Sequence, residues 1–289
     1  MTGEWIEIKA RGRPEAKDEA VKCLMDAGSP GVLEEELSDK KPARCTAYIR
    51  PEERKALRRL EEALSAIGWT FTTSRYRDRD WSIAWRSGIR PVRLSFRGSS
   101  LVVKPTWRRA RKAPGDVVVE IDPSMAFGTG GHPTTRLCLR AILRLLKTGS
   151  LRPAPSVLDI GTGTGVLAIA AKKLGAGRCT GVDTDPVALK VARKNARLNR
   201  ARVVVSSKPV EEVPGTFDLI VANIVSNVLK RLAPVIVKKM RPAGLVILSG
   251  ILTEEAASVV DACAKAGLKS LKRYDSGEWC SLILGKTFL

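Results

Sequence analysis

The chain has 289 residues, of which 44% are hydrophobic, so it can bury a core in one large domain or in two ordinary ones. It has no run of about 18 uncharged apolar residues and no secretory signal at its N-terminus, so we expect neither a membrane span nor export. The formal net charge of +20 is compatible with a polyanionic partner such as nucleic acid, or with solubility alone. Six scattered cysteines without a C-x-x-C pair and a single histidine favour a reducing cytoplasm and predict no metal site.

Residues 1–80 predict a ferredoxin-like α+β domain. Alternating apolar residues predict strands over 5–10, 32–37, 44–49 and 70–76. A helix opening at Pro14 and ending at Gly28, and a second over 52–67, complete the order βαββαβ. Such a unit buries one face of its sheet under two helices and leaves the other face free to bind a partner.

Residues 81–125 predict a connecting region with short strands over 92–96, 101–103 and 117–121. Trp81, Trp85 and Trp107 alternate with arginines there, which suits either packing between domains or base stacking on nucleic acid. We favour packing between domains.

Residues 126–289 predict a parallel sheet covered by helices on both faces, because β and α patterns alternate and the strands are continuously apolar. The last two strands follow one another without a helix, which predicts that the final strand is antiparallel. The expected helices are 136–146, 165–174, 186–198, 225–240 and 254–266, and the expected strands are 156–160, 178–183, 202–206, 217–223, 244–249, 270–274 and 280–285.

A glycine-rich turn follows the first of these strands, in the segment Val157–Gly165. Gly161, Gly163 and Gly165 allow a sharp turn and a close approach of ligand to the helix N-terminus. The dinucleotide fingerprint requires Gly or Ala where this chain has Val166, so the turn favours a methyltransferase over a nicotinamide enzyme.

Two further strands end in polar residues. Asp183 ends the second strand of this domain, where a carboxylate can accept both hydroxyls of a ribose, and Asp185 before Pro186 is expected to cap the next helix. Asn223 ends the fourth strand and is expected beside the reacting group. Its segment Asn223–Ser226 lacks the aromatic residue of an Asn/Asp-Pro-Pro-aromatic tetrad, which argues against methylation of a flipped base.

The segment Ala126–Thr135 precedes the first helix of this domain and contains three glycines, His132 and several threonines. The threonine hydroxyls can bind a cofactor carboxylate or cap the helix. His132 can act as a general base or order the loop, and we favour the ordering role.

These motifs together resemble the ribosomal protein L11 methyltransferase family across the whole chain. The family pattern is Phe-Gly-Thr-Gly-x-His-Pro-Thr-Thr, then Asp-x-Gly-x-Gly-x-Gly, Asp-x-Asp-Pro, Asn-Ile and a late Glu-Trp-Cys, here Glu278–Cys280. Gly131 replaces the usual Thr before the histidine, and Val225–Asn227 replaces the usual Leu-Ala-Asx near the expected acceptor site.

The resemblance implies a Rossmann-like, seven-stranded class I methyltransferase domain over 126–289, with the N-terminal domain recognising the substrate. It implies S-adenosylmethionine as cofactor, a large-subunit ribosomal protein as substrate, transient contact with ribosomal RNA and a cytoplasmic location. The implied cofactor contacts are Phe127, Thr134, Thr135, Gly161, Gly163, Gly165, Asp183 and Asn223.

We expect Asn223 to be catalytic, orienting a neutral lysine ε-amine or N-terminal α-amine together with nearby carbonyl groups. Three alternatives remain at this point: methylation of RNA or DNA, which the basic charge favours; methylation of a different protein; and a non-catalytic ribosome- or RNA-binding protein that retains the cofactor fold.

Overall fold

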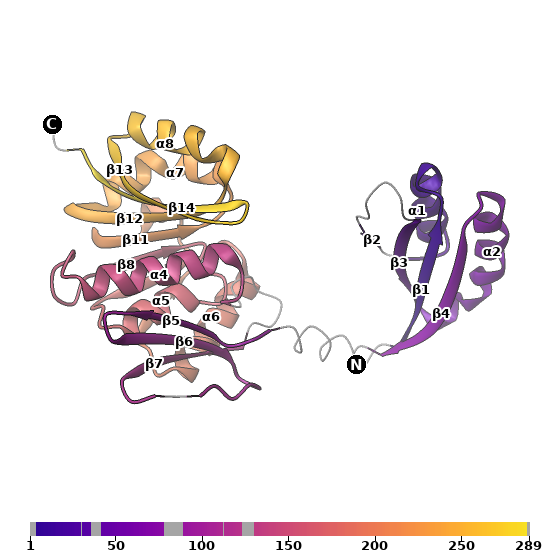
Figure 1. The fold of residues 1–289 in the computed structure, drawn as a ribbon, viewed down its shortest axis with the longest axis horizontal. Coiled ribbons are helices and arrows are strands. Elements are labelled where there is room, and N and C mark those ends of the chain that lie inside the picture. The colour runs from indigo at the N-terminus through magenta and orange to yellow at the C-terminus, as the bar shows by residue number, and fades with distance from the viewer. Residues whose placement is uncertain are drawn as a thin grey trace. The chain divides into compact units, whose positions relative to one another are not determined.

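A computed structural model describes residues 4–29, 31–35, 42–77, 89–111, 113–122 and 130–287. The chain forms two compact units, residues 1–88 and residues 89–289 (Figure 1). No helix within the described ranges is long and apolar enough to cross a membrane.

The N-terminal unit has the predicted order βαββαβ. Its four-stranded antiparallel sheet has the strand order β2-β3-β1-β4, and both helices lie on one face of it (Figure 1). Apolar residues alternate along the strands, so the helix-covered face contains Ile6, Ile8 and Ala10 of β1. The elements are β1 (Glu4–Gly12), α1 (Lys17–Asp26), β2 (Val32–Glu35), β3 (Ala43–Ile49), α2 (Ala56–Ala66) and β4 (Thr70–Arg77), with short 3-10 helices at Pro14–Ala16 and Pro51–Lys55.

The C-terminal unit contains a seven-stranded sheet with the order β10-β9-β8-β11-β12-β14-β13. Six strands run in the same direction, and β14, which lies between β12 and β13, is antiparallel to both, as predicted. The strands are β8 (Val157–Ile160), β9 (Cys179–Val182), β10 (Val203–Ser206), β11 (Phe217–Asn223), β12 (Met240–Leu252), β13 (Leu268–Ser276) and β14 (Trp279–Lys286).

Helices cover both faces of this sheet, which explains why its central strands are apolar on both sides (Figure 1). One apolar core joins one face to α4 and α5, and a second joins the other face to α7 and α8. The helices are α4 (Pro133–Lys147), α5 (Val166–Lys173), α6 (Pro186–Leu198), α7 (Ser226–Lys239) and α8 (Ala256–Lys265), with 3-10 turns at Val210–Glu212 and Thr253–Glu255.

A third sheet corrects the expected domain boundaries. Strands β5 (Val92–Phe96), β6 (Ser99–Pro105) and β7 (Asp116–Ile121), expected in a connecting region over 81–125, form a three-stranded sheet inside the C-terminal unit. Their apolar side chains share the core of α4 and α5. Trp81 and Trp85 lie outside the described residues.

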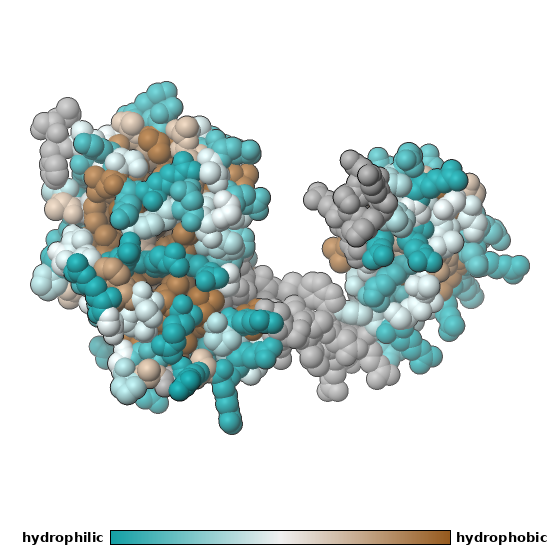
Figure 2. Space-filling view, in the orientation of Figure 1, coloured by the Kyte–Doolittle hydropathy of each residue, from teal (hydrophilic) through white to brown (hydrophobic). Residues whose placement is uncertain are grey.

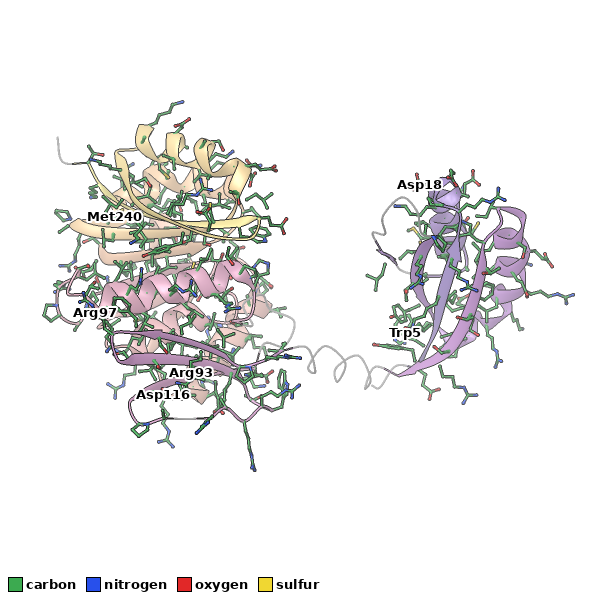
Figure 3. The ribbon with its side chains drawn as sticks, in the orientation of Figure 1. Trp5, Asp18, Arg93, Arg97, Asp116 and Met240 are labelled. Carbon is green, nitrogen blue, oxygen red and sulfur yellow. The ribbon has the colours of Figure 1, made fainter. Side chains whose placement is uncertain are left out.

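Asn195 of α6 and Asn199, which follows the helix directly, hold the edge of this small sheet. Asn199 accepts a hydrogen bond from the Glu120 backbone N–H and donates to the Glu120 carbonyl, at 2.8 and 2.6 Å. Asn195 makes the same pair of bonds with Asp122, at 2.9 and 3.1 Å. Across the sheet, Arg93 of β5 forms a bidentate pair with Asp116 of β7, both labelled in Figure 3, so the sheet is fixed at several points.

Candidate active site

Three predicted site residues lie together at the carboxyl ends of neighbouring strands. In the sheet, β8 lies between β9 and β11, with Ile160 opposite both Val182 and Ala222. The next residues along each strand are therefore Gly161, Asp183 and Asn223. In open α/β sheets, ligands bind at this edge, where the strand order reverses.

The glycine-rich turn brings β8 close to its neighbours. Gly161 has φ +70°, and a Cβ atom there would collide with Cγ2 of Ile224, which follows Asn223. Gly165 has φ +81°, and its Cβ would lie 3.3 Å from the Ala192 backbone of α6. Gly161 is thus required where the two strand ends meet, and Gly165 where α5 passes α6.

Two backbone N–H groups hold the Asp183 carboxylate beside the glycine-rich turn. Its Oδ2 accepts from the Gly163 N–H at 2.9 Å, and its Oδ1 accepts from the Asp185 N–H at 3.0 Å. The side chain is half-exposed, so each oxygen keeps a lone pair that a ligand hydroxyl can reach. Asp185 accepts from the Val187 N–H at 2.8 Å at the start of α6, which confirms the predicted helix cap.

Asp159, to which the sequence analysis assigned no role, is a buried carboxylate beneath the turn. Its Oδ2 accepts from Thr162 Oγ1 at 2.7 Å and from the Ala168 N–H at 3.2 Å, whereas its Oδ1 has no partner among the described residues. Burial raises the pKa of Asp159 to about 6, and the neighbouring charge of Asp183 adds to the increase. The signal in the sequence was a carboxylate inside an otherwise apolar strand.

Asn223 provides a second buried acceptor at the same edge. Its Nδ2 donates to Thr135 Oγ1 at 3.4 Å, which joins β11 to the first turn of α4. Its Oδ1 is buried and has no partner within the described part of the chain. A buried acceptor without a partner is costly, so Asp159 and Asn223 both indicate that donor groups of a ligand bind here.

His132 caps α4. Its Nδ1 lies 3.4 Å from the Thr134 N–H, which donates to it, and 2.8 Å from Thr134 Oγ1. The edge of the imidazole meets the Trp279 ring at a centroid distance of 5.3 Å. The structure therefore favours the loop-ordering role of His132 and places His132 against Trp279 of the Glu-Trp-Cys motif.

Thr134 contributes to this cap, and its carbonyl accepts from Ser249 Oγ at 3.4 Å. Of the other predicted contacts, Thr135 is buried beside Asn223. Phe127 lies outside the described residues.

Comparison with known proteins decides the family. A family model described as ribosomal protein L11 methyltransferase (PrmA) matches residues 4–287. The chain belongs to this family. The match includes both units of the structure.

Individual members of the L11 methyltransferase family agree. The chain is 44% identical over 212 residues to the ribosomal protein L11 methyltransferase of Geobacter metallireducens, covering 73% of this chain and 68% of that one. It is 37% identical to that of Pelotomaculum thermopropionicum, covering 96% and 98%. A crystal structure of the ribosomal protein L11 methylase of Lactobacillus delbrueckii subsp. bulgaricus has a TM-score of 0.60 and 31% identity, covering 65% of this chain and 95% of that one.

As a member of this methyltransferase family with the matching α/β fold, the chain uses S-adenosylmethionine. The residues at the strand ends fit this cofactor. The unpartnered oxygens of Asp159 and Asn223 suit its N–H donors, and the Asp183 carboxylate suits its ribose hydroxyls.

Proposed function

We propose that this L11 methyltransferase family member transfers methyl groups to amino groups of ribosomal protein L11, at lysine ε-amines, the N-terminal α-amine or both. The observation that carries the proposal is the pair of buried, unpartnered acceptors, Asp159 Oδ1 and Asn223 Oδ1, beside the glycine-rich turn. The family match over residues 4–287 supports ribosomal protein L11 as the acceptor.

When bound, S-adenosylmethionine supplies a methyl group on a positively charged sulfur. The acceptor amine has an ordinary pKa of about 10.4 and must lose a proton before it can attack. A site that excludes water and holds a positive charge nearby lowers that pKa. Bulk water takes the released proton in this mechanism.

Asn223 would align the neutral amine. Thr135 holds its Nδ2, and the buried Oδ1 has two lone pairs, so it can accept one N–H of the substrate amine as well as one of the cofactor. That hydrogen bond would direct the nitrogen lone pair towards the methyl group, and alignment of this kind supplies much of the rate enhancement in a displacement reaction.

We propose that the N-terminal unit is a ferredoxin-like substrate-recognition domain that binds the ribosomal protein through its open sheet face. Glu7 on this face accepts from Ser74 Oγ at 2.9 Å and from the Tyr48 hydroxyl at 3.3 Å. The Tyr48 and Tyr76 rings lie 4.9 Å apart. The Arg50 guanidinium lies 3.7 Å from the ring centroid of Trp5, which is labelled in Figure 3. Aromatic and arginine side chains are the residue types enriched at protein interfaces.

The ribosomal substrate supports two further parts of the proposal. We place the protein in the cytoplasm, and we expect transient contact with ribosomal RNA, which a net charge of +20 favours. In Figure 2, hydrophilic side chains are spread over the visible surface of each unit, with hydrophobic areas between them on the C-terminal unit.

Methyl transfer from isotope-labelled cofactor to separated ribosomal proteins and naked ribosomal RNA tests the proposal. We expect label in one ribosomal protein, with its intact mass increasing in steps of one methyl group, and a large loss of label with Asn223→Ala. Label in RNA alone would assign a different acceptor to the same site. Bound cofactor with no label in either fraction would indicate another protein substrate or a non-catalytic protein.

A further inference from the structure

A second concave surface lies beside the edge strand β10. Its volume is about 480 Å³, and it is lined by residues of α6, of the following turn and of β10. Four of its eight lining residues are arginines, and none is acidic. We call it the arginine pocket; its arginines are Arg193, Arg197, Arg200 and Arg202.

The fold places these arginines on one surface. Arg193 and Arg197 of α6 are spaced i, i+4 and so share one face of the helix, Arg200 lies in the turn after the helix, and Arg202 lies just before β10. Arg193 reaches across to the strand, where its Nη2 donates to the Val205 carbonyl at 3.2 Å. All four residues are exposed, and none has an acidic partner within the described ranges.

Interactions within the folded chain do not account for four neighbouring arginines. A basic residue in the last turn of α6 complements the helix dipole, which accounts for Arg197 but not for Arg193 or Arg202. Like charges at i and i+4 repel one another. Arg200 has φ 51°, a left-handed conformation in which glycine or asparagine is the usual residue after a helix. The cluster therefore costs stability that a bound anion would restore.

We propose that the arginine pocket binds the phosphate backbone of RNA. Guanidinium groups form planar, bidentate contacts with phosphate oxygens. Arg193 and Arg197 are separated by about 6 Å along the axis of α6. A strand of a nucleic-acid duplex rises roughly 3 Å per nucleotide, so this distance spans about two successive nucleotides.

The high net charge of the chain favours RNA over an acidic protein as the ligand of this pocket. The choice of RNA also rests on the proposed function, because ribosomal proteins lie against ribosomal RNA. The pocket and the candidate active site share no residue. Arg200 and Arg202 lie at the amino end of β10, whereas Arg193 reaches Val205 near its carboxyl end, where Ser206 accepts a hydrogen bond from the Asp183 N–H at 3.3 Å. RNA bound at Arg200 and Arg202 would therefore lie at the strand ends opposite the cofactor residues.

Binding of fluorescein-labelled 12-nucleotide polyuridylate and of a 16-base-pair RNA duplex, measured by anisotropy over a range of salt concentrations, tests the pocket. The test variant is Arg193→Glu with Arg197→Glu. The matched control is Arg231→Glu with Lys238→Glu, two exposed residues of α7 on the opposite face of the sheet, which changes the net charge equally. Arg193→Lys with Arg197→Lys retains the charge without the planar guanidinium, and circular dichroism verifies folding of each variant.

We expect the test variant to bind RNA on the order of tenfold more weakly at 0.15 M salt, with a salt dependence shallower by roughly 1.5 in log–log slope, because two phosphate contacts are lost. The control variant should change both values much less. Equal losses in the two variants, or wild-type binding to polyglutamate but not to RNA, would overturn the proposal. The test variant should still methylate the isolated ribosomal protein. If the wild-type protein failed to methylate it, the proposed function would be wrong, while the RNA-binding result would still stand.

Discussion

Replacing Asp159 with asparagine should have opposite effects on folding and on cofactor binding. Asparagine has the same shape, and its Oδ1 can accept from Thr162 and Ala168 as the carboxylate Oδ2 does. It removes the buried charge and places an N–H group where the wild type has an unpartnered oxygen. The stability of the cofactor-free protein and its affinity for cofactor should therefore change in different directions.

The stability effect follows from the pKa. Burial raises the pKa of Asp159 from 3.8 to about 6, so the folded protein holds this proton more tightly than the unfolded chain does. The free energy of unfolding therefore falls as the pH rises from about 4 to 6, and the ionised carboxylate costs roughly 3 kcal/mol above that range. Asp159→Asn should remove this pH dependence and make the cofactor-free protein more stable than the wild type at pH 8.

The affinity effect follows from the lost acceptor. A hydrogen bond to a charged group contributes about 1.5–3 kcal/mol, so the variant should bind S-adenosylmethionine roughly 10- to 150-fold more weakly. Urea unfolding at pH 5 and pH 8 and titration calorimetry with the cofactor measure the two effects. Wild-type cofactor affinity in Asp159→Asn, or a variant less stable than the wild type at pH 8, would refute the reasoning.

Three further variants test other parts of the site and fold. Gly161→Ala should destabilise the protein by about 2 kcal/mol and weaken cofactor binding, since the new methyl group meets Ile224; adding Ile224→Ala should recover part of the loss in thermal melts. Asp218→Ala should cost about 2–4 kcal/mol in urea unfolding at pH 7, because it removes the acceptor for two buried donors of Ser156. Burial would raise the pKa of Asp218, but its hydrogen bonds outweigh burial and lower the pKa below 3.8. The stabilisation by the Asp218 carboxylate is therefore complete above pH 3.8 and is lost as the pH falls through the folded-state pKa. Asp218→Ala should not show this acid-induced loss of stability. His132→Asn keeps a helix-capping residue and should retain turnover, whereas a hundredfold loss would identify His132 as a base.

Much of the C-terminal fold could be predicted from sequence, because its strands are short apolar runs separated by periodic helices. The helix expected over 136–146 begins earlier, at Pro133, because His132 caps it. The placement of β5–β7 could not be predicted, since the side chains that hold their edge come from the C-terminal part of α6 and the residue after it, 73 to 79 residues further along the chain. Nothing in the local pattern of residues 92–121 identifies that partner.

The candidate site, too, could be predicted only in part from the sequence. Its glycines and terminal polar residues were identified because each follows an apolar strand, and the structure brings Gly161, Asp183 and Asn223 to one edge. The role of Ile224 depends on how β8 and β11 align, which the sequence of either strand alone does not specify. The unpartnered oxygen of Asp159 likewise becomes apparent only once its hydrogen bonds are known.

The position of β14 has a consequence for synthesis of the protein. This strand lies between β12 and β13, and among the described residues β13 pairs with no other strand. While residues 279–286 are still inside the ribosomal exit tunnel, β13 cannot join the sheet, and the apolar groups that β14 contributes to both cores are missing. The edge of β12 is then open to pairing with other chains. The C-terminal unit can therefore complete its folding only after residues 279–286 have left the tunnel, and until then its open strand edge is exposed to aggregation.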